Sequence, residues 1–469
     1  MVFHHTWELR RDFAAELSRM YGTEVPAYDT LVEVSTGVNS DVVSAAGDGA
    51  ERLGSIERVT AERHGAIRVG SPREMAQAAR VFAAFGMYPV GFYDLREAAK
   101  SSVPVVSTAF RPIDPEELAR NPFRVFTSML TADDPRFFSP ELQEELQDFL
   151  ASRVLFDDAL LSLADRAVRE GGLEDRFARR LVDMATAAFE LSETPVDETW
   201  YRRLEEISAV AADIGGVSTT HINHLTPRVL DIDELYRRME DLGIAMIDEV
   251  QGPPAWEGPD ILLRQTSFRA LEEQRVFRFS DGTVGEGSLR VRFGEVEQRG
   301  IALTPAGREL YDHMLAETDR RLAAGEGNGV RTAVAEQVWR ENLPDTEEGL
   351  RRAGLAYFTY AVRRPAVGET PTDLDSLIAH GVVEATPIVY EDFLPRSAAG
   401  IFQSNLTDEG TRDNDQRGTD YSMETLSDII GVPIADPYEL YARQEAASLH
   451  QLEVDLGHPV LTDHTALTV

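Results

Sequence analysis

The segment between residues 221 and 300 most constrains the fold, because strand-like and helix-like patterns follow one another there in a fixed order. Apolar and β-branched residues predict four strands and one helix. The strands are predicted over 218–226, 244–250, 261–268 and 288–300, and the helix over 231–243. This β-α-β-β-β order follows a mainly helical pattern at residues 114–213, so the sequence predicts an α+β protein. No internal repeat is evident.

The first predicted strand carries two histidines, His221 and His224. The β-branched residues around them favour a strand. Because side chains alternate faces along a strand, we expect His224 to share a face with Ile222 and Thr226. His221 is then expected to share the other face with Asn223. One histidine can therefore face a ligand while the other has a structural role, although a polar strand end with two ordinary histidines fits this stretch equally well.

A second histidine-bearing strand is predicted over residues 63–69, followed by a helix over 73–85. His64 and Arg68 share one face of this strand, and the small side chain of Ala66 lies between them. A metal-binding histidine with an arginine two strand steps away would suit an anionic ligand bound at a metal. An edge strand with an exposed histidine and arginine fits the same pattern.

The last predicted strand places a carboxylate on an apolar face, which is formed by Val291, Phe293 and Glu295. A buried carboxylate without a partner is very costly, so Glu295 requires a metal ion or an arginine. His64, His224 and Glu295 are thus candidate ligands on three separate strands. Two imidazoles and one carboxylate that leave open coordination positions suit non-haem iron(II) oxygen chemistry.

Composition narrows the classes of function. The 469-residue chain has no cysteine, which excludes disulfides, thiolate metal sites, iron–sulfur clusters and cysteine nucleophiles. Its formal net charge of −35 disfavours a nucleic-acid partner. Lys100 is the only lysine, so pyridoxal Schiff-base chemistry is a poor fit. Residues 1–5 lack a signal-peptide pattern and no apolar run approaches membrane-spanning length, so we expect a cytoplasmic enzyme with no membrane partner.

Four motifs resemble the 2-oxoadipate dioxygenase/decarboxylases of bacteria and plants. The motifs are Arg63-His64-Gly65-Ala66-Ile67-Arg68, His221-Ile222-Asn223-His224-Leu225-Thr226-Pro227-Arg228, Phe293-Gly294-Glu295-Val296-Glu297-Gln298-Arg299-Gly300 and Ser397-Ala398-Ala399-Gly400-Ile401-Phe402-Gln403-Ser404-Asn405-Leu406. This family belongs to the vicinal oxygen chelate superfamily, whose βαβββ unit agrees with the order of elements in 221–300. The resemblance implies an α+β fold with a vicinal oxygen chelate-type βαβββ half-barrel core inside a large helical shell.

The resemblance also implies how the chain is divided. It covers nearly the whole sequence, so we expect a single catalytic unit over residues 1–469. The expected regions are a first metal-bearing strand region at 50–112, a mainly helical insertion at 113–214, a βαβββ metal-binding core at 215–303, and a helical C-terminal region with a substrate loop at 304–469.

By the same resemblance, iron(II) (Fe²⁺) is held by His64, His224 and Glu295. The likeness of two motifs to the ligand strands of 4-hydroxyphenylpyruvate dioxygenase favours His224 over His221 and Glu295 over Glu297. His221 and Glu297 are expected beside the ligands, where they would orient them. Each stays open as an alternative ligand, because it lies close in sequence to the favoured one.

The substrate implied by the resemblance is a 2-oxo dicarboxylate, which would chelate the metal through its carboxylate and keto oxygen. Arg68 would grip a substrate carboxylate through a bidentate pair. With O2, 2-oxoadipate would lose its first carboxylate and be hydroxylated to 2-hydroxyglutarate, in lysine catabolism. Further substrate contacts are expected from Gln265, Ser267, Arg396, Ser397, Gln403 and Asn405. Arg396 stands where a smaller apolar residue is expected, and a second cation there could change the chain-length preference.

Three alternatives remain at this level. A related dioxygenase could act on a 2-oxo acid of another chain length. A metal isomerase or hydrolase on the same scaffold would use zinc or nickel without oxygen. A non-enzymatic 2-oxo-acid sensor would bind its ligand without turnover and would use residues 114–213 as a partner surface. Oxygen uptake with 2-oxoadipate and added iron(II) separates the enzyme classes.

Overall fold

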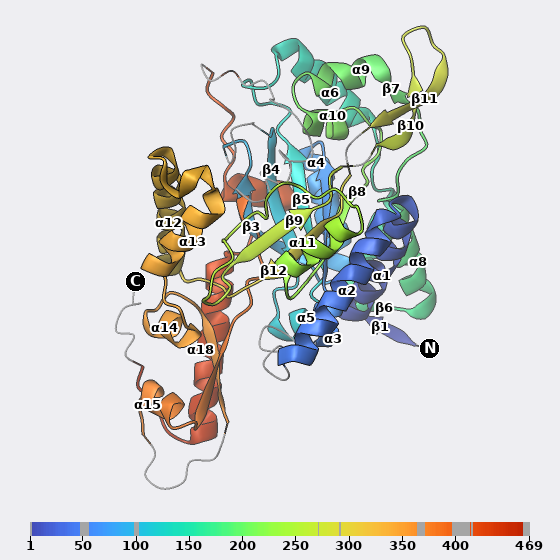
Figure 1. Cartoon of the computed structure of the whole chain (residues 1–469). Helices are drawn as coiled ribbons and strands as arrows, with labels where there is room; N and C mark the ends of the chain where they lie inside the picture. The colour runs from blue at the N-terminus through green and yellow to red at the C-terminus, as the bar shows by residue number, and fades with distance from the viewer. Residues whose placement is uncertain are drawn as a thin grey trace.

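A five-stranded sheet holds both predicted histidine strands. In the computed structural model, which describes residues 2–46, 56–97, 103–270, 272–289, 292–363, 371–395, 413 and 416–462, its strands are β2 (Arg63–Val69), β3 (Tyr88–Asp94), β4 (Val105–Arg111), β5 (Arg124–Leu130) and β8 (Ile222–Pro227). Their order is β3-β4-β5-β2-β8 (Figure 1). β2 pairs with β5 in parallel and with β8 antiparallel, so it lies inside the sheet. The edge-strand alternative for His64 and Arg68 is therefore wrong.

A second, antiparallel pair extends this sheet beyond β8. It consists of β9 (Leu263–Ser267) and β12 (Glu295–Arg299). The chain leaving β8 meets β12 through a parallel bridge between Arg228 and Glu297. On the far edge of β9, the 246–251 segment makes isolated bridges. The strands therefore continue from β8 through β12 and β9 to this segment.

Two βαβββ modules lie side by side in this run of strands. The first module is β2, helix α4 (Pro72–Ala84), β3, β4 and β5. The second is β8, helix α11 (Ile232–Asp241), the 246–251 segment, β9 and β12. In each module the first and last strands are parallel neighbours. The predicted α+β class is confirmed, and the βαβββ order predicted in 221–300 is present with the 246–251 segment, held by isolated bridges, in the place of its second strand. The first module repeats this order of elements without visible sequence similarity.

Several predicted elements differ from the structure. Residues 244–250 form no regular strand, because their backbone pairs with β9 only at separate points. Within the stretch 288–300, Ser288 and Leu289 end β11 (Val284–Leu289), which forms a hairpin with β10 (Glu273–Arg278), and β12 begins only at Glu295. β5 was not predicted, because all seven of its residues are buried and it shows no alternation within a mainly helical region.

Helices dominate the N-terminal and middle parts of the chain, as predicted for residues 114–213 apart from β5 and the short strands β6 (Gly172–Glu174) and β7 (Val196–Asp197). They are α1 (Thr6–Glu24), α2 (Ala27–Ala46), α3 (Ile56–Ala61), α5 (Pro115–Arg120), α6 (Pro140–Ser152), α7 (Asp158–Glu170), α8 (Asp175–Ala187), α9 (Glu198–Glu205) and α10 (Ala209–Gly215). α9 and α10 are separate helices, and the side chain of Ser208 caps α10. α1 begins at Thr6, because the residues before it form β1 (Phe3–His5), which pairs with β6.

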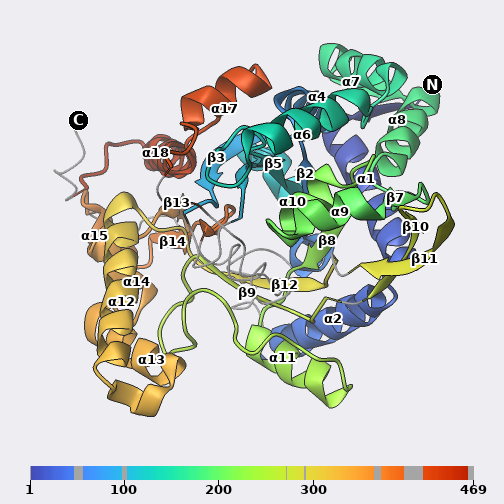
Figure 2. The same cartoon turned by 90° about the horizontal axis from the view of Figure 1, so that it is seen from above.

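The C-terminal part packs beside the sheet. Its elements are α12 (Pro305–Ala323), the 3-10 helix η2 (Glu326–Gly329), α13 (Arg331–Asn342), α14 (Glu347–Arg352), β13 (Phe358–Val362), α15 (Leu374–Ala379), β14 (Val383–Pro387), α17 (Met423–Ile430) and α18 (Pro437–Leu456). Both views place α12, α13 and α14 on one side of the strands and α1 and α8 on the other (Figures 1 and 2). Among the described helices, none combines the length and the apolar character needed to cross a membrane.

The long sheet is buried on both faces. Its outer face carries Ile67 and Val69 of β2, which belong to a core shared with α1, α2, α4 and α11. Its inner face carries Ala66 of β2 and Phe126 of β5, which belong to a second core shared with α6, α10 and the C-terminal elements. The alternation predicted for 63–69 therefore places His64, Ala66 and Arg68 on the inner face.

Candidate metal centre

A β-bulge decides which side chains of β8 reach the inner face. The register between β2 and β8 shifts between Ala66 and Ile67, which leaves Asn223 as an extra residue. Ile222 consequently packs in the outer core, whereas His224 turns to the inner face. The prediction that His224 shares a face with Ile222 is wrong, because an extra residue interrupts strict alternation.

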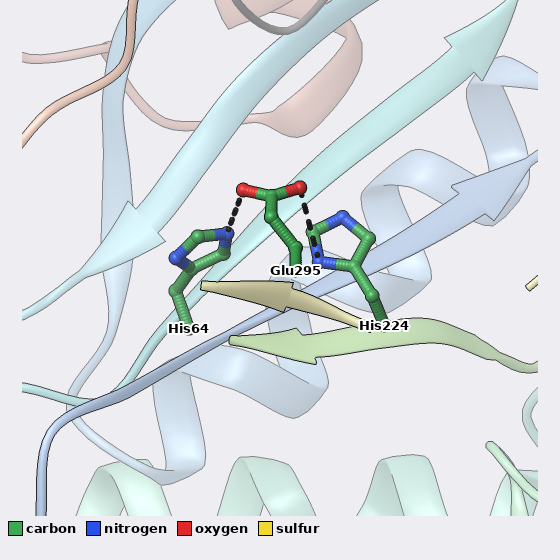
Figure 3. A group of neighbouring side chains, drawn as sticks. All are labelled: His64, His224 and Glu295. Atoms are coloured by element: carbon green, nitrogen blue, oxygen red, sulfur yellow. Dashed lines mark ion pairs between the residues drawn. The ribbon is translucent and has the colours of Figure 1, made fainter. Parts of the chain in front are cut away.

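Three buried side chains, His64, His224 and Glu295, converge on the inner face (Figure 3). One nitrogen or oxygen atom of each lies within 4.8 Å of the others. His64 Nε2 is 3.4 Å from Glu295 Oε1, and His224 Nδ1 is 3.6 Å from Glu295 Oε2. Figure 3 shows the carboxylate between the two rings. The structure thus brings together the three predicted ligands, one from the first module and two from the second.

Each of these side chains contacts a buried polar neighbour that can fix its orientation. The pairs are His64 Nδ1 with Glu297 Oε2 at 2.9 Å, His224 Nδ1 with Thr226 Oγ1 at 2.9 Å, and Glu295 Oε1 with Gln265 Nε2. A carboxylate beside Nδ1 of a histidine keeps the proton on that nitrogen and leaves Nε2 for a metal. Glu297 therefore lies where a partner of His64 was expected.

Burial and charge prepare this group for a cation. Burial opposes protonation of His64, but the carboxylates of Glu297 and Glu295 outweigh it and raise the pKa of His64 above its usual value. Burial lowers the pKa of His224 to about 4, so its imidazole is neutral at neutral pH. Burial would raise the pKa of Glu297, but Arg299 and His64 lower it to about 2. Nitrogen and oxygen donors in a negative environment fit a divalent metal ion.

The two carboxylates near His64 differ in their partners. Glu297 Oε1 lies 2.7 Å from Arg299 Nε and 3.5 Å from Arg124 Nη1, and all three side chains are fully buried. Within the described part of the chain, Glu295 has no arginine within the 4.0 Å ion-pair distance. Because two guanidinium groups already balance the charge of Glu297, Glu295 is the carboxylate that still needs a cation.

Arg68 and His221 meet at Asp213 instead of joining the three ligands. Arg68 Nη1 donates to Asp213 Oδ2, and Asn223 Nδ2 donates to the same oxygen at 3.1 Å. His221 Nε2 lies 3.4 Å from Asp213 Oδ1. Burial lowers the pKa of His221 to about 3, so it is neutral. His221 and Asn223 share a face, as predicted. Because of the bulge, this is also the face that carries His224. The contact of His221 with Asp213 favours His224 over His221 as the metal ligand.

Aromatic rings line the ligand group. The ring of Phe293 stacks on His224 with centroids 5.3 Å apart, and Phe393 meets His64 edge-on at 5.0 Å. Phe126 of β5 packs against Phe393 at 5.0 Å. These rings hold the imidazoles in place and reduce the space for water beside them.

Of the other residues predicted to contact the substrate, some belong to the described part of the chain and others do not. Gln265 donates to Glu295, and Ser267 lies opposite Glu295 in the register of β9 and β12. The predicted contacts Arg396, Ser397, Gln403 and Asn405 lie outside the described residues. Sequence reasoning missed Asp213, because an acidic residue near the end of a predicted helix gives no signal of a buried ion pair. The hydrogen bond of Thr226 to a ligand was also missed, although its place on the face of His224 could have indicated it.

Comparison with known proteins agrees with these observations. The sequence model of the family described as 2-oxoadipate dioxygenase/decarboxylase matches residues 13–405. The protein of that name from Mycobacterium bovis is 54% identical over 436 residues, which cover 93% of this chain and 96% of its relative. This chain belongs to the 2-oxoadipate dioxygenase/decarboxylase family. The family member from Pseudomonas putida is 43% identical over 452 residues, which cover 94% of this chain and 95% of that one.

Solved structures of the family share the whole architecture. The crystal structure of hydroxyglutarate synthase from Pseudomonas putida in complex with 2-oxoadipate has a TM-score of 0.84 and 40% identity, and covers 97% of this chain and 99% of its own. An uncharacterised protein from Shigella flexneri has a TM-score of 0.81 and 38% identity, and covers 96% and 99%. Family membership confirms the resemblance carried by the four motifs. A dioxygenase family implies a metal, and His64, His224 and Glu295 are the group that could hold one among the residues described.

Proposed function

We propose that this protein is an iron(II) enzyme that converts 2-oxoadipate and O2 to 2-hydroxyglutarate and CO2. The convergence of His64, His224 and Glu295 on the inner face carries this proposal, because two imidazoles and a carboxylate are the set used for non-haem iron(II) oxygen chemistry. The keto carbon takes one oxygen atom as it becomes a carboxylate, and the adjacent carbon takes the other as a hydroxyl group. The oxo-acid end of the substrate supplies the electrons, so no separate reductant is needed.

The side chains around the ligands prepare this chemistry. His64, His224 and Glu295 would hold iron(II), which would supply a binding position for the 2-oxo acid and the activation of O2. Glu297 keeps the proton of His64 on Nδ1, and Gln265 holds the carboxylate of Glu295 through one oxygen. The phenyl ring stacked on His224 limits water beside the ligands.

Arg68 is proposed to bind a substrate carboxylate. It lies on the inner face of the same strand as His64, and its charge helps to lower the pKa of His224, after the larger effect of burial. Asp213 anchors one terminal nitrogen of its guanidinium group and so restricts the plane of the group. Three further points stay predictions. They are contacts of the substrate with Gln265, Ser267 and the undescribed residues after 395, a cytoplasmic location, and a role in lysine catabolism.

Oxygen consumption tests the proposed function. Protein loaded with iron(II) under anaerobic conditions is mixed with 2-oxoadipate in an oxygen electrode, and CO2 and 2-hydroxyglutarate are quantified. We expect equal amounts of O2 consumed and CO2 released, with no activity in metal-free or zinc-loaded protein. Turnover with zinc or nickel and no oxygen uptake would support the isomerase or hydrolase alternative. Binding without turnover under any metal would support a sensor, and faster turnover of a shorter or longer 2-oxo acid would change the substrate.

A further inference from the structure

A pocket of about 310 Å³ lies beside the start of β8 and apart from the metal group. Its lining comes from residues 216–219, from α9, from β7 and β10, and from Phe149 of α6. None of the three predicted metal ligands belongs to this lining. The pocket is therefore a space of its own, large enough for a small organic ligand.

Arg275 of β10 lines this pocket with an unpaired edge of its guanidinium group. The residue is only 7% exposed, and its Nη1 donates to the carbonyl oxygen of Ser192 at 3.1 Å. Within the described part of the chain, Nε and Nη2 have no hydrogen-bond acceptor, and no carboxylate lies within the 4.0 Å ion-pair distance. Nε and Nη2 lie along one edge of the group, where a carboxylate can accept two parallel hydrogen bonds.

The positive charge of Arg275 is costly to bury without a partner. The buried Arg292, by contrast, pairs with Glu24 and Glu273. Burial lowers the pKa of Arg275, and Glu273 and Asp213 oppose this from beyond the ion-pair distance. An arginine keeps its proton under ordinary conditions, so a bound anion would remove the cost.

The charged residues of the lining favour a ligand with one negative charge. Arg275 and Arg278 supply two positive charges and Asp197 supplies one negative charge, which leaves a single positive charge in excess. Burial lowers the pKa of His221, which also lines the pocket, to about 3, so this side chain is neutral. Asp197 and Arg278 are exposed register partners of β7 and β10, whereas Arg275 is buried. The pocket thus leads from an exposed mouth to a buried guanidinium group.

Two aromatic side chains give the pocket an apolar wall. Phe149 and Trp200 both line it, and their ring centroids lie 5.9 Å apart. Both side chains are partly buried against the inner core. The indole N–H of Trp200 donates to the carbonyl oxygen of Gly215 at 2.8 Å, which restrains its ring. Such a wall suits a ligand with a flat, apolar body, because aromatic rings pack favourably against one another.

We propose that this pocket binds a small aromatic monocarboxylate, whose carboxylate accepts hydrogen bonds from Nε and Nη2 of Arg275 and whose ring packs against Phe149 and Trp200. It would be a second binding site of the chain, separate from the metal group, and it does not rest on the proposed function. The ligand would remove the cost of burying Arg275 without a counter-ion, which contributes to its binding free energy.

Calorimetric titration of the intact chain with benzoate tests the site. We expect one benzoate bound per chain, with binding about 30-fold weaker in Arg275→Gln, because the charge-assisted pair is lost. Benzamide, which has the same ring without the charge, should bind weakly to both proteins. Phthalate, which adds a second carboxylate to the ring, should bind more weakly than benzoate. Arg202→Gln is the matched control, because it removes a positive charge from α9 outside the pocket lining and should bind benzoate as the wild type does.

His64→Ala distinguishes this pocket from the metal group. It removes a predicted metal ligand and should leave the affinity for benzoate within about twofold of the wild type. Loss of benzoate binding in His64→Ala with retention in Arg275→Gln would place the ligand at the metal group and overturn the proposal. No binding to the wild type would also overturn it, and tighter binding of phthalate would contradict the preference for one charge.

A crystal of the wild type soaked with 4-bromobenzoate decides the question if Arg275→Gln does not fold. The proposal predicts an anomalous bromine peak inside the pocket, with the carboxylate toward Arg275. A peak elsewhere, or no peak, would overturn it.

Discussion

The two βαβββ modules use the same frame of strands for different tasks. Each places a histidine on its first strand, and an arginine follows four positions later: His64 and Arg68 in the first module, His224 and Arg228 in the second. Both histidines face the same ligand group. The arginines differ in their partners, since Arg228 pairs with Glu62 in a buried ion network whereas Arg68 pairs with Asp213.

The last strands of the modules differ more sharply. The second module presents Glu295 on β12 to the ligand group, whereas the first presents Phe126 on β5, which packs against Phe393. Phe393 in turn contacts the ring of His64. One module therefore supplies a single ligand and an apolar wall, and the other supplies two ligands. A symmetric pair of modules would instead present a carboxylate from each last strand.

The largest expected effect comes from the ligands themselves. His64→Ala, His224→Ala and Glu295→Ala should each lose bound iron and reduce oxygen uptake to background, because two remaining side chains cannot hold the ion. Metal analysis by mass spectrometry and the oxygen electrode measure both quantities. His221→Ala is the matched control, at the residue directly before β8. Full activity in His224→Ala, with loss in His221→Ala, would show that the ligand assignment on β8 is wrong.

Much of this asymmetry could be predicted from the sequence. The strand predicted over 63–69 has the same bounds in β2, because a glycine–serine–proline turn ends it and starts the capped helix α4. His64, His224 and Glu295 were singled out by residue type and by resemblance, and the structure brings them together. Glu295 stood out because a carboxylate on an apolar strand face needs a cation.

The rest depends on tertiary packing that the sequence does not display. β5 was missed because a fully buried strand shows no alternation. The bulge at Asn223 was missed because an extra residue becomes visible only when β8 is aligned with β2. The ion pair of Asp213 with Arg68 joins residues 145 positions apart, and no local pattern marks such a pair.

The second-largest expected effect distinguishes the role of Arg228 from that of Arg68. Arg228→Gln should lower the free energy of unfolding by about 3 kcal/mol, because it removes a buried partner of Glu62, whose Oε2 lies 2.9 Å from Arg228 Nη1. KM for 2-oxoadipate should stay unchanged in the protein that folds. Urea unfolding and steady-state kinetics measure the two effects. A raised KM without loss of stability would place Arg228 at the substrate.

Arg68→Gln should show the opposite pattern. We expect kcat/KM for 2-oxoadipate to fall about 100-fold, which corresponds to the loss of a charge-assisted pair, while iron content remains that of the wild type. The measurement is steady-state kinetics together with metal analysis of the same preparation. Unchanged kinetics on 2-oxoadipate would remove the substrate role of Arg68.

A smaller effect concerns the free energy of unfolding, which should depend on pH through His221. Burial lowers the pKa of His221 to about 3, below the value of about 6.5 in an unfolded chain. The unfolded state therefore binds more protons than the folded state below about pH 6.5, and the free energy of unfolding falls as the pH falls through this window. Between about pH 7 and pH 5, the metal-free wild type should lose about 2 kcal/mol more than His221→Gln. Parallel pH profiles of the two proteins would contradict a buried neutral His221.

Anomalous diffraction at the iron edge, from crystals of the protein loaded with iron(II), tests the central claim most directly. The account predicts one strong peak within bonding distance of a nitrogen of His64, a nitrogen of His224 and an oxygen of Glu295. A peak bound instead by His221 or Glu297, or no peak on the inner face of the sheet, would contradict the claim that two unequal modules together hold one metal ion.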